Sequence, residues 1–329
     1  MARLTNWENQ IGGRLRLRDL HVLFTVADRG SMAKAAVQLG ISQPAVSDVI
    51  ANLEHALGVR LFDRSSQGVE PTMYGRALLK RGLAAFDELK QGIRDIEFLS
   101  DPTSGELRIG CGVTVSASIL PSIVHRFSQQ YPRVVLHVNL VPPPTRDLSG
   151  LRERKHDLIL GRWAVARTHD SQGDDLNVEL LFDDPLVVVA GAQTRWVSRR
   201  KIDLAELIDE SWILTPPNTW NYTGLAEAFE ARGLAMPKIS VVTSSMEVST
   251  YLLANGQFVT AHARSFADRH LLKILPVELP VRRWPVAIVT LKKRTLSPVV
   301  ERFVECARDE VKSIAGRPNR TAHPKPNVS

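Results

Sequence analysis

The chain of 329 residues is poor in cysteine and has no long hydrophobic run. Its two cysteines, Cys111 and Cys306, are too few for a disulfide framework, which favours a reducing compartment. The longest apolar run lies at 185–192, well short of the roughly 18 residues that span a membrane. Residues 1–13 lack the apolar core of a secretion signal and are expected to form an N-terminal extension. These absences predict a cytoplasmic protein that makes no membrane contact.

The motifs of common enzymes and metal sites are missing as well. No nucleophile elbow, P-loop or HExxH motif is present, and the nine histidines show no metal-ligand spacing. The stretch Gly110-Cys111-Gly112 imitates the start of a dinucleotide fingerprint, but Val115 occupies the position of the third glycine. We therefore expect no catalysis, cofactor or metal. An enzyme stays the first alternative, which specific binding to the protein's own upstream DNA would exclude.

Basic residues exceed acidic ones, with 42 Lys and Arg against 35 Asp and Glu and a formal charge of +7. Part of the excess lies in residues 312–329, which hold four basic residues and no acidic one and are expected to be a disordered tail. Residues 1–81 carry eleven basic and seven acidic side chains. This balance permits an anionic partner such as nucleic acid without establishing one.

Residues 14–77 show three helical patterns in close succession. Apolar spacing predicts helices over about 18–28 and 32–39. Gly40 then tolerates a positive φ, and Pro44 suits the first turn of a third amphipathic helix. A short helix, a tight turn and a helix with polar N-terminal residues is the layout of a helix-turn-helix. An ordinary three-helix bundle is the alternative that spacing alone leaves open.

The string from Gly30 to Phe62, GSMAKAAVQLGISQPAVSDVIANLEHALGVRLF, resembles the DNA-binding domain of the LysR family of bacterial transcription regulators. Its most diagnostic parts are 42–47 and 53–64. The resemblance implies a winged helix-turn-helix whose third helix enters the major groove and whose wing, at about 60–70, contacts phosphates. The residues expected at base edges are Ser42, Gln43, Pro44 and Ser47, and those that complete the DNA-binding set are Ser31, Asp48, Arg60 and Arg64.

Two positions depart from the pattern that the family implies. Asp48 adds an acidic group to the reading face, where it repels phosphate unless it accepts a hydrogen bond from a cytosine amino group. Gln67 stands where many members carry arginine, so one phosphate contact is expected to be missing. The DNA-binding surface is therefore predicted to be less basic than the overall charge suggests.

Residues 72–100 predict one long linker helix. Its apolar residues recur about every 3.5 positions, which is the period of a coiled-coil seam. The resemblance implies antiparallel pairing of two linker helices in a dimer, and packing against the chain's own domain is the alternative. The seam residues are Leu79, Leu83, Phe86, Leu89, Ile93 and Ile96. A polar break at 101–105 marks the domain boundary.

Short apolar runs alternate with amphipathic helices over residues 105–311. This alternation predicts an α/β fold with mainly parallel sheets covered on both faces. The segment GELRIGCGVTVSASILPSIVHRFSQQYPRVVLHV resembles the start of the LysR effector domain, which is similar to the periplasmic binding proteins with their two hinged lobes. We expect lobe I at about 105–178 and 278–311, and lobe II at about 179–277.

Ligands of open α/β sheets bind beyond the carboxyl ends of the strands. By resemblance, the loop after the first strand and Arg162 contact the effector, and a guanidinium fork suits a carboxylate or sulfate. We therefore expect a small anionic metabolite such as a sugar acid. The stretch 60–82 looks closest to regulators of sugar-binding-protein or sugar-acid genes. The expected effector contacts are Thr114, Val115, Ser116, Thr145, Arg162, Pro216, Asn218 and Ser244.

The chain is thus predicted to be a sequence-specific transcription regulator of mixed fold. An α-helical winged helix-turn-helix and a linker helix precede a two-lobed α/β effector domain, and the effector switches promoter activity. The expected partners are double-stranded operator DNA, the effector, a second copy of the chain in a dimer or tetramer, and RNA polymerase. Two alternatives remain: a thiol-based redox sensor of the same family, and a nucleoid architectural protein.

Overall fold

The structure is a computed structural model that describes residues 15–65, 68–141, 148–163, 175–191, 194–196, 198–281 and 284–315. The chain divides into two compact units, Met1–Lys90 and Gln91–Ser329, which are described separately. The expected extension at 1–13, residues 316–329 of the expected tail, Gln67 and Thr145 lie outside the described residues. Within the described part of the chain, no helix combines the length and the apolar character that crossing a membrane requires.

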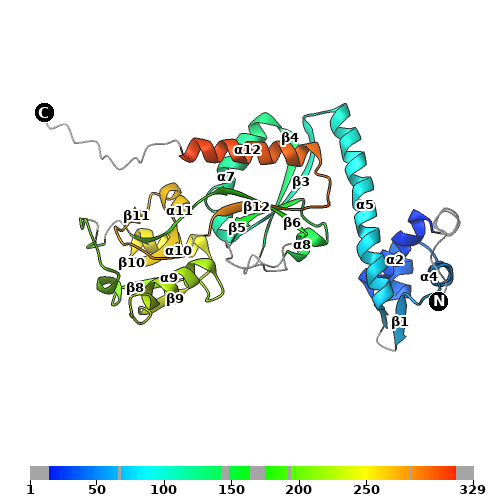
Figure 1. Ribbon diagram of the computed structural model, residues 1–329, viewed down its shortest axis with the longest axis horizontal. Helices are drawn as coiled ribbons and strands as arrows, with labels where there is room; N and C mark the ends of the chain where they lie inside the picture. The colour runs from blue at the N-terminus through cyan, green and yellow to red at the C-terminus, as the bar shows by residue number, and fades with distance from the viewer. Residues whose placement is uncertain are drawn as a thin grey trace. The chain divides into compact units, whose positions relative to one another are not determined.

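In the described part of the first unit, three short helices, a two-stranded hairpin and the start of a longer helix pack around one apolar core, and Figure 1 shows these elements together. The short helices and the hairpin are α2 (Leu17–Arg29), α3 (Met32–Leu39), α4 (Gln43–Leu57), β1 (Phe62–Ser65) and β2 (Gly68–Pro71). Local sequence sets the helix boundaries. The Ser42 hydroxyl accepts a hydrogen bond from the Ala45 amide at 3.3 Å, and α4 ends at Gly58, where φ is 69°. The predicted helix-turn-helix is therefore confirmed.

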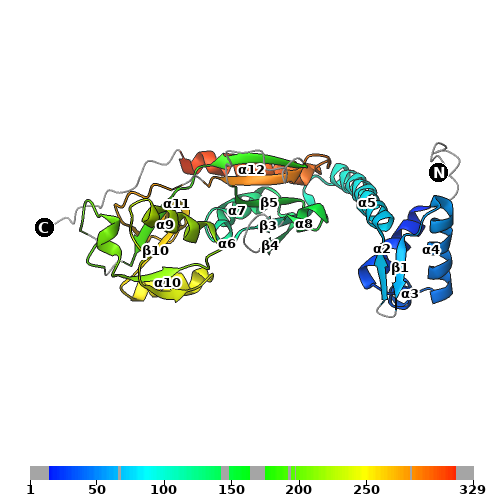
Figure 2. The ribbon, with the colours of Figure 1, turned by 60° about the horizontal axis from the view of Figure 1, so that its bottom comes forward.

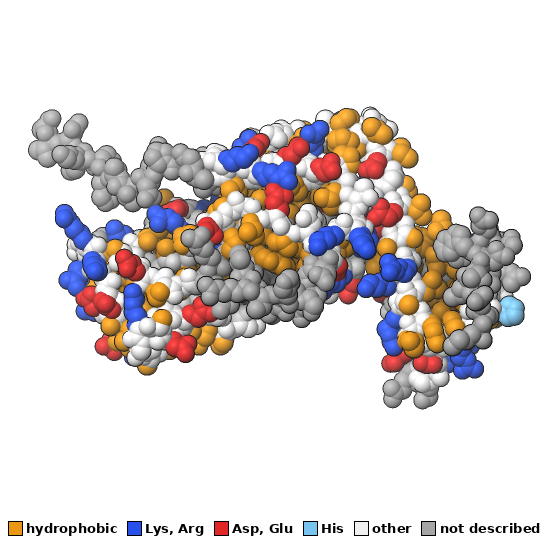
Figure 3. Space-filling view, in the orientation of Figure 1, with side chains coloured by type: hydrophobic (Ala, Val, Ile, Leu, Met, Phe, Trp, Pro, Cys, Tyr) orange, Lys and Arg blue, Asp and Glu red, His pale blue; other side chains and the backbone are white. Residues whose placement is uncertain are grey.

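Helix α5 (Met73–Ser100) is the predicted linker helix. Its seam residues have different surroundings along the helix. Leu79 and Phe86 pack against the core of the first unit, and the Phe86 ring lies 5.6 Å from that of Phe24. Leu83 is half-buried, whereas Leu89, Ile93 and Ile96 are exposed. Figure 3 shows hydrophobic side chains gathered over the C-terminal end of α5. Packing within the chain thus partly buries the first seam residues and leaves the seam residues nearer the C-terminal end of α5 exposed.

Lobe I of the second unit is a five-stranded sheet with the order β4-β3-β5-β12-β6. Its strands are β3 (Ser104–Cys111), β4 (Arg133–Leu140), β5 (Leu158–Arg162), β6 (Leu176–Phe182) and β12 (Val286–Leu291). The helices α7 (Leu120–Gln130) and α12 (Pro298–Ala315) lie side by side on one face (Figure 2). A smaller apolar cluster beneath α8 (Ser149–Arg152) covers the other face. The central strand β5 is buried at all five positions.

Lobe II is a second five-stranded sheet, with the order β11-β7-β10-β8-β9. Its strands are β7 (Leu186–Ala190), β8 (Ser211–Leu214), β9 (Ile239–Val242), β10 (Phe258–Ala263) and β11 (Lys273–Ile274). Its α-helices are α9 (Trp220–Glu230), α10 (Met246–Asn255) and α11 (Arg264–Arg269). Separate apolar clusters contain Val188 and its neighbour Val189, which point to opposite faces of β7. Both faces of this sheet are therefore covered, as predicted.

The prediction of mainly parallel sheets is wrong. Strand β12 runs antiparallel to both β5 and β6, and β7 runs antiparallel to both β10 and β11. The reason is that the chain crosses between the lobes twice, and β7 and β12 are the strands that enter a sheet after each crossing. Strand β6 was not expected, and it pairs with β12 up to Phe182, so lobe I continues past the boundary expected at 178.

Candidate DNA-binding surface and interlobe cavity

The N-terminus of α4 presents the side chains that were expected to read bases. Ser42, Gln43 and Pro44 are exposed there, Ser47 is half-buried, and Asp48 is exposed on the same helix. The Ser42 hydroxyl also caps the helix, so one of its lone pairs is already used. Gln43 therefore presents an exposed side-chain amide, which can both donate and accept hydrogen bonds, at the helix start.

Ser31 is half-buried and its hydroxyl accepts a hydrogen bond from the Lys34 amide at 3.4 Å. It therefore has the capping role that its position before α3 predicts. Arg60 and Arg64 are exposed at the start of the wing and on β1. Two cations on an exposed hairpin suit phosphate contacts.

The wing is held by contacts that the sequence analysis did not identify. The Glu54 carboxylate accepts hydrogen bonds from the amides of Leu61 at 2.7 Å and Phe62 at 3.2 Å, so it connects α4 to β1. The Val69 amide donates to the Gly30 carbonyl at 2.9 Å and fixes β2 to the turn before α3. The Leu-Glu pair of the diagnostic string is therefore part of the scaffold that positions the wing.

A cavity of about 550 Å³ lies between lobes I and II of the second unit. Six of the expected effector contacts line it: Thr114, Val115, Arg162, Pro216, Asn218 and Ser244. Ser116 does not line it, and its hydroxyl donates to the Val113 carbonyl at 2.7 Å within its own turn. The lining residues that are not among the expected contacts are Gly112, Val113, Val141, Thr215, Thr219, Trp220, Asn221, Thr223, Glu227, Met246 and Trp284.

The cavity walls combine apolar and polar groups. Trp220 stands at the start of α9 and its indole N–H donates to the Thr114 hydroxyl across the lobes at 3.4 Å. Met246 occupies the first position of α10, so the N-termini of two helices border the cavity. The positive ends of helices favour anionic groups, while Glu227 adds a carboxylate of its own. Such walls suit a small organic molecule with both apolar and hydrogen-bonding parts.

Arg162 lines the cavity but is not a free guanidinium fork. Its Nη1 donates to the carbonyls of Asp184 and Trp284, each at 2.9 Å, and its Nη2 forms an ion pair with the Asp184 carboxylate. Its guanidinium carbon lies 3.9 Å from the ring centroid of Trp220. Burial lowers the pKa of Arg162, and the Asp184 charge opposes that shift. The charge expected to bind an anion is therefore already neutralised.

Asp184 and Trp284 belong to the two segments that connect the lobes, between β6 and β7 and before β12. Asp184 also accepts hydrogen bonds from the amide and the hydroxyl of Ser265, at 2.9 and 2.6 Å, at the start of α11. Arg162 thus joins lobe I to both connections and, through Asp184, to lobe II. No short motif could indicate this role, because its partners are distant in the chain.

The two cysteines lie in the apolar core of lobe I, Cys111 on β3 and Cys306 on α12. Burial raises the pKa of the Cys111 thiol to about 12 and also raises the pKa of the Cys306 thiol. A reactive thiolate is therefore disfavoured at both positions. In the described part of the chain, no group of three or more His, Cys, Asp or Glu side chains could hold a metal ion.

We expect Cys111 to resist alkylation in the folded protein at pH 7 and to react once urea unfolds it, because unfolding returns the thiol to water and to its ordinary pKa. The measurement is mass spectrometry after brief treatment with N-ethylmaleimide, with and without urea. Rapid native labelling of Cys111 would instead support thiol-based sensing.

Two family models match the chain. The model described as "Bacterial regulatory helix-turn-helix protein, lysR family" matches residues 17–76, and "LysR substrate binding domain" matches residues 100–312. Among curated relatives, the uncharacterized HTH-type transcriptional regulator YdcI of Escherichia coli K12 is 27% identical over 299 residues, covering 90% of this chain and 95% of the relative. The regulator GbpR of Azospirillum brasilense is 26% identical over 302 residues, covering 89% and 85%.

Solved structures share the fold. Full-length OxyR of Pseudomonas aeruginosa is 22% identical with a TM-score of 0.61, covering 91% of this chain and 95% of that one. Full-length CbnR in complex with its target DNA is 21% identical with a TM-score of 0.50, covering 90% and 100%. At these identities the likeness concerns the arrangement of the domains' elements and carries no residue roles.

Proposed function

Because the chain belongs to the LysR family, and is therefore a DNA-binding transcription regulator with an effector-binding domain, we propose that a small molecule in the interlobe cavity switches its activity at a promoter. The observation that carries this proposal is the cavity of about 550 Å³ with walls from both lobes. A ligand that contacts both lobes binds one lobe arrangement better than another, and it shifts the population by that difference in affinity.

For DNA reading, we propose that side chains at the start of α4 contact bases and that side chains of the wing contact phosphates. Ser42, Gln43, Pro44 and Ser47 take the first role, with Asp48 as an acceptor for a cytosine amino group. Arg60 and Arg64 take the second. The support is the exposure of these side chains on a confirmed helix-turn-helix scaffold. Ser31 contributes by positioning α3.

Gln43→Ala should reduce the discrimination between operator and random DNA by about 1–3 kcal/mol, because it removes a base contact. Arg64→Ala serves as the matched comparison and should weaken binding to both DNAs similarly, since phosphates carry no sequence. The measurement is a titration of labelled upstream DNA and of scrambled DNA at one salt concentration. Unchanged selectivity in the Gln43 variant contradicts the assignment.

We also propose that two copies pair through the uncovered part of α5, where Leu89, Ile93 and Ile96 are exposed. An apolar stripe at coiled-coil spacing is stabilised by a partner helix. Pairing places two reading heads on a two-fold operator, in a dimer or in a tetramer built from dimers. Such a protein acts in the cytoplasm, at the nucleoid, with RNA polymerase as a further partner at the promoter.

We propose a small anionic metabolite as the effector, with sugar acids as the first class to test. Arg162 does not bind its anionic group. That guanidinium is paired with Asp184. The support comes from the N-terminus of α9, where no side chain caps the first amides and whose positive end suits a carboxylate, whereas the Ser245 hydroxyl already caps α10. The hydroxyls of Thr114 and Ser244 and the amide of Asn218 are available for the remaining polar groups.

Ser244→Trp should abolish the thermal stabilisation that a cavity ligand gives, because the indole fills space between the lobes. The control is Ser240→Trp, which places the same side chain at an exposed position on β9 that does not line the cavity. The measurement is the Tm in the presence of D-gluconate, D-galactonate and their neutral parent sugars. A ligand that stabilises the Ser244 variant as it does the wild type binds elsewhere.

A further inference from the structure

Strand β5 carries an ion pair at each of its ends, and the function proposed above uses neither. Asp157 directly precedes the strand, and Arg162 is its last residue. Both side chains are buried, with 2% and 3% of their surface exposed. Charges removed from water in this way require fixed partners, so their positions are tightly determined. The partners at the two ends belong to different parts of the effector domain.

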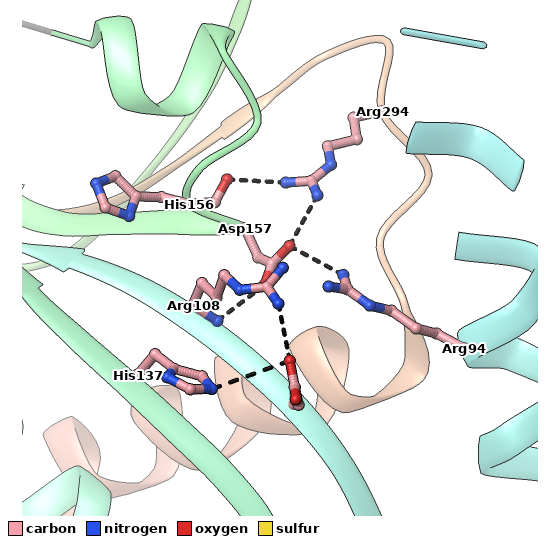
Figure 4. A network of polar contacts seen from close by, with 7 residues as sticks. Arg94, Arg108, His137, His156, Asp157 and Arg294 are labelled. Carbon is pink, nitrogen blue, oxygen red and sulfur yellow. Dashed lines mark hydrogen bonds and ion pairs between the residues drawn. The ribbon is translucent and has the colours of Figure 1, made fainter. Parts of the chain in front are cut away.

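At the first end, Asp157 receives two arginines, one from the segment after β12 and one from α5 (Figure 4). Arg294, which follows β12, donates from Nη2 to the Asp157 carboxylate at 2.7 Å and from Nη1 to the His156 carbonyl at 2.9 Å. Arg94, on α5, donates to the same carboxylate oxygen at 3.3 Å. The second oxygen accepts from the Arg108 amide at 2.8 Å. The linker helix is thereby held to the central strand of lobe I.

A second residue of α5 joins the same cluster. With the Gln91 amide oriented so that its oxygen faces the two arginines, that oxygen accepts from Arg294 Nη2 at 3.0 Å and from Arg94 Nη1 at 3.3 Å. Gln91 and Arg94 are three positions apart and therefore share one face of the helix. Arg94 remains partly accessible, with 18% of its side chain exposed, whereas Arg294 is as buried as Asp157. The last turns of α5 are thus attached to lobe I by polar contacts.

At the other end, Arg162 connects the strand to the lobe connections and to Trp220, which lines the cavity. Of the five residues of β5, Leu158 to Leu160 pair with β3 on one side and Ile159 to Arg162 pair with β12 on the other. The length of the strand is about 16 Å at the usual rise per residue. A buried strand paired on both edges moves as one body, since bending it would break hydrogen bonds on both sides.

We propose that β5 couples the state of the interlobe cavity to the linker helix, with Asp157 and Arg94 as the positioning residues at the helix end. A ligand that changes the stacking of Trp220 on Arg162 displaces β5, and Asp157 carries the displacement to Arg94 and Gln91. Because α5 is one continuous helix, a change at its last turns alters the placement of the reading heads. The final step rests on the proposed dimeric function, while the coupling itself does not.

The test is a double-mutant cycle that needs no ligand. Trp220→Leu perturbs the cavity end, and Arg94→Met removes the linker's guanidinium while leaving Asp157 paired with Arg294. Mutations at opposite ends of a strand of this length, with no shared partner, normally act additively. Lys90→Met is the matched control, an exposed cation one turn earlier on the same helix. Arg94→Lys, which keeps the charge, should largely restore the wild-type behaviour.

The first measurement is amide hydrogen exchange of residues 91–100 in the full chain. In the wild-type background and in the Lys90→Met control, we expect Trp220→Leu to raise the exchange rate of these amides about twofold or more. In the Arg94→Met background, Trp220→Leu should not raise that rate further. Equal effects of Trp220→Leu in all backgrounds, or no effect in any, would overturn the coupling. A purely structural role for Arg94 predicts equal effects.

The second measurement separates the coupling from the dimeric function. Affinity is compared for upstream DNA with two half-sites and for a single half-site. The coupling predicts that Arg94→Met changes only the two-half-site affinity, whereas Lys90→Met changes neither. A wild type that binds both DNAs equally would refute the proposed dimer, and with it the last step, while the exchange cycle still decides whether β5 couples the cavity to α5.

Discussion

Arg162→Ala is expected to lower the free energy of unfolding of the effector-binding domain by about 3–5 kcal/mol, the usual cost of leaving one member of a buried ion pair without its partner. The carboxylate of Asp184 has 2% of its surface exposed, and of the donors described for it the two of Ser265 would remain. Two carbonyls, those of Asp184 and Trp284, would lose a donor as well. The measurement is urea unfolding of the protein without ligand, followed by circular dichroism.

The matched control is Arg308→Ala, which removes a bidentate pair with Glu179 on the surface of the same domain. Both of those side chains are substantially exposed, so the loss should stay below about 1 kcal/mol. If Arg162→Ala unfolds like the wild type and loses only ligand binding, Arg162 acts as a direct effector contact. That outcome would return it to the role first expected from the sequence.

Gly75→Ala is expected to destabilise the DNA-binding domain by about 1–3 kcal/mol, the range for overpacking a tight core. A Cβ at this position would lie 2.1 Å from the carbonyl oxygen of Leu61. That oxygen is backbone and already accepts a hydrogen bond from the Thr72 amide at 2.9 Å. The start of α5 would therefore have to move away from the wing. Denaturant unfolding and operator affinity should both reveal the change.

Gly92→Ala is the control, because it makes the same substitution on the same helix with no atom within 4 Å of the new Cβ. There the substitution should stabilise the helix by about 0.5–1 kcal/mol, since alanine restricts the unfolded chain more than glycine does. The two variants should thus differ in sign. A stabilising Gly75→Ala would show that the wing does not pack against α5 as described.

The helices of the DNA-binding domain were predictable because local interactions determine them. Ser42 caps α4 by a bond to an amide three residues away, and Gly40 and Gly58 end their helices with positive φ. The diagnostic string added the family, and the family implied the two lobes. For the cavity, the same reasoning identified the loop after β3 and the end of β5 in lobe I and two loops in lobe II, since strand ends can be located from apolar runs.

Contacts between distant residues decided the rest. Phe86 reads as a seam residue, yet its ring packs on Phe24 in the same domain. Trp220 and Trp284 carry no motif and meet at the cavity only because the chain crosses between the lobes twice. Those crossings also reverse β7 and β12, which is why an alternating pattern of strands and helices did not produce parallel sheets.

The sequence by itself determined the helix-turn-helix, the linker helix, the α/β class and the family, because each depends on residues a few positions apart or on a recognisable string. The tertiary structure decided what Arg162 does. Its guanidinium suggested an anion contact, but Asp184 lies 22 positions away and Trp284 122 positions away. A charged side chain that is already paired within the protein is not available to pair with a ligand, and only the folded structure brings such partners together.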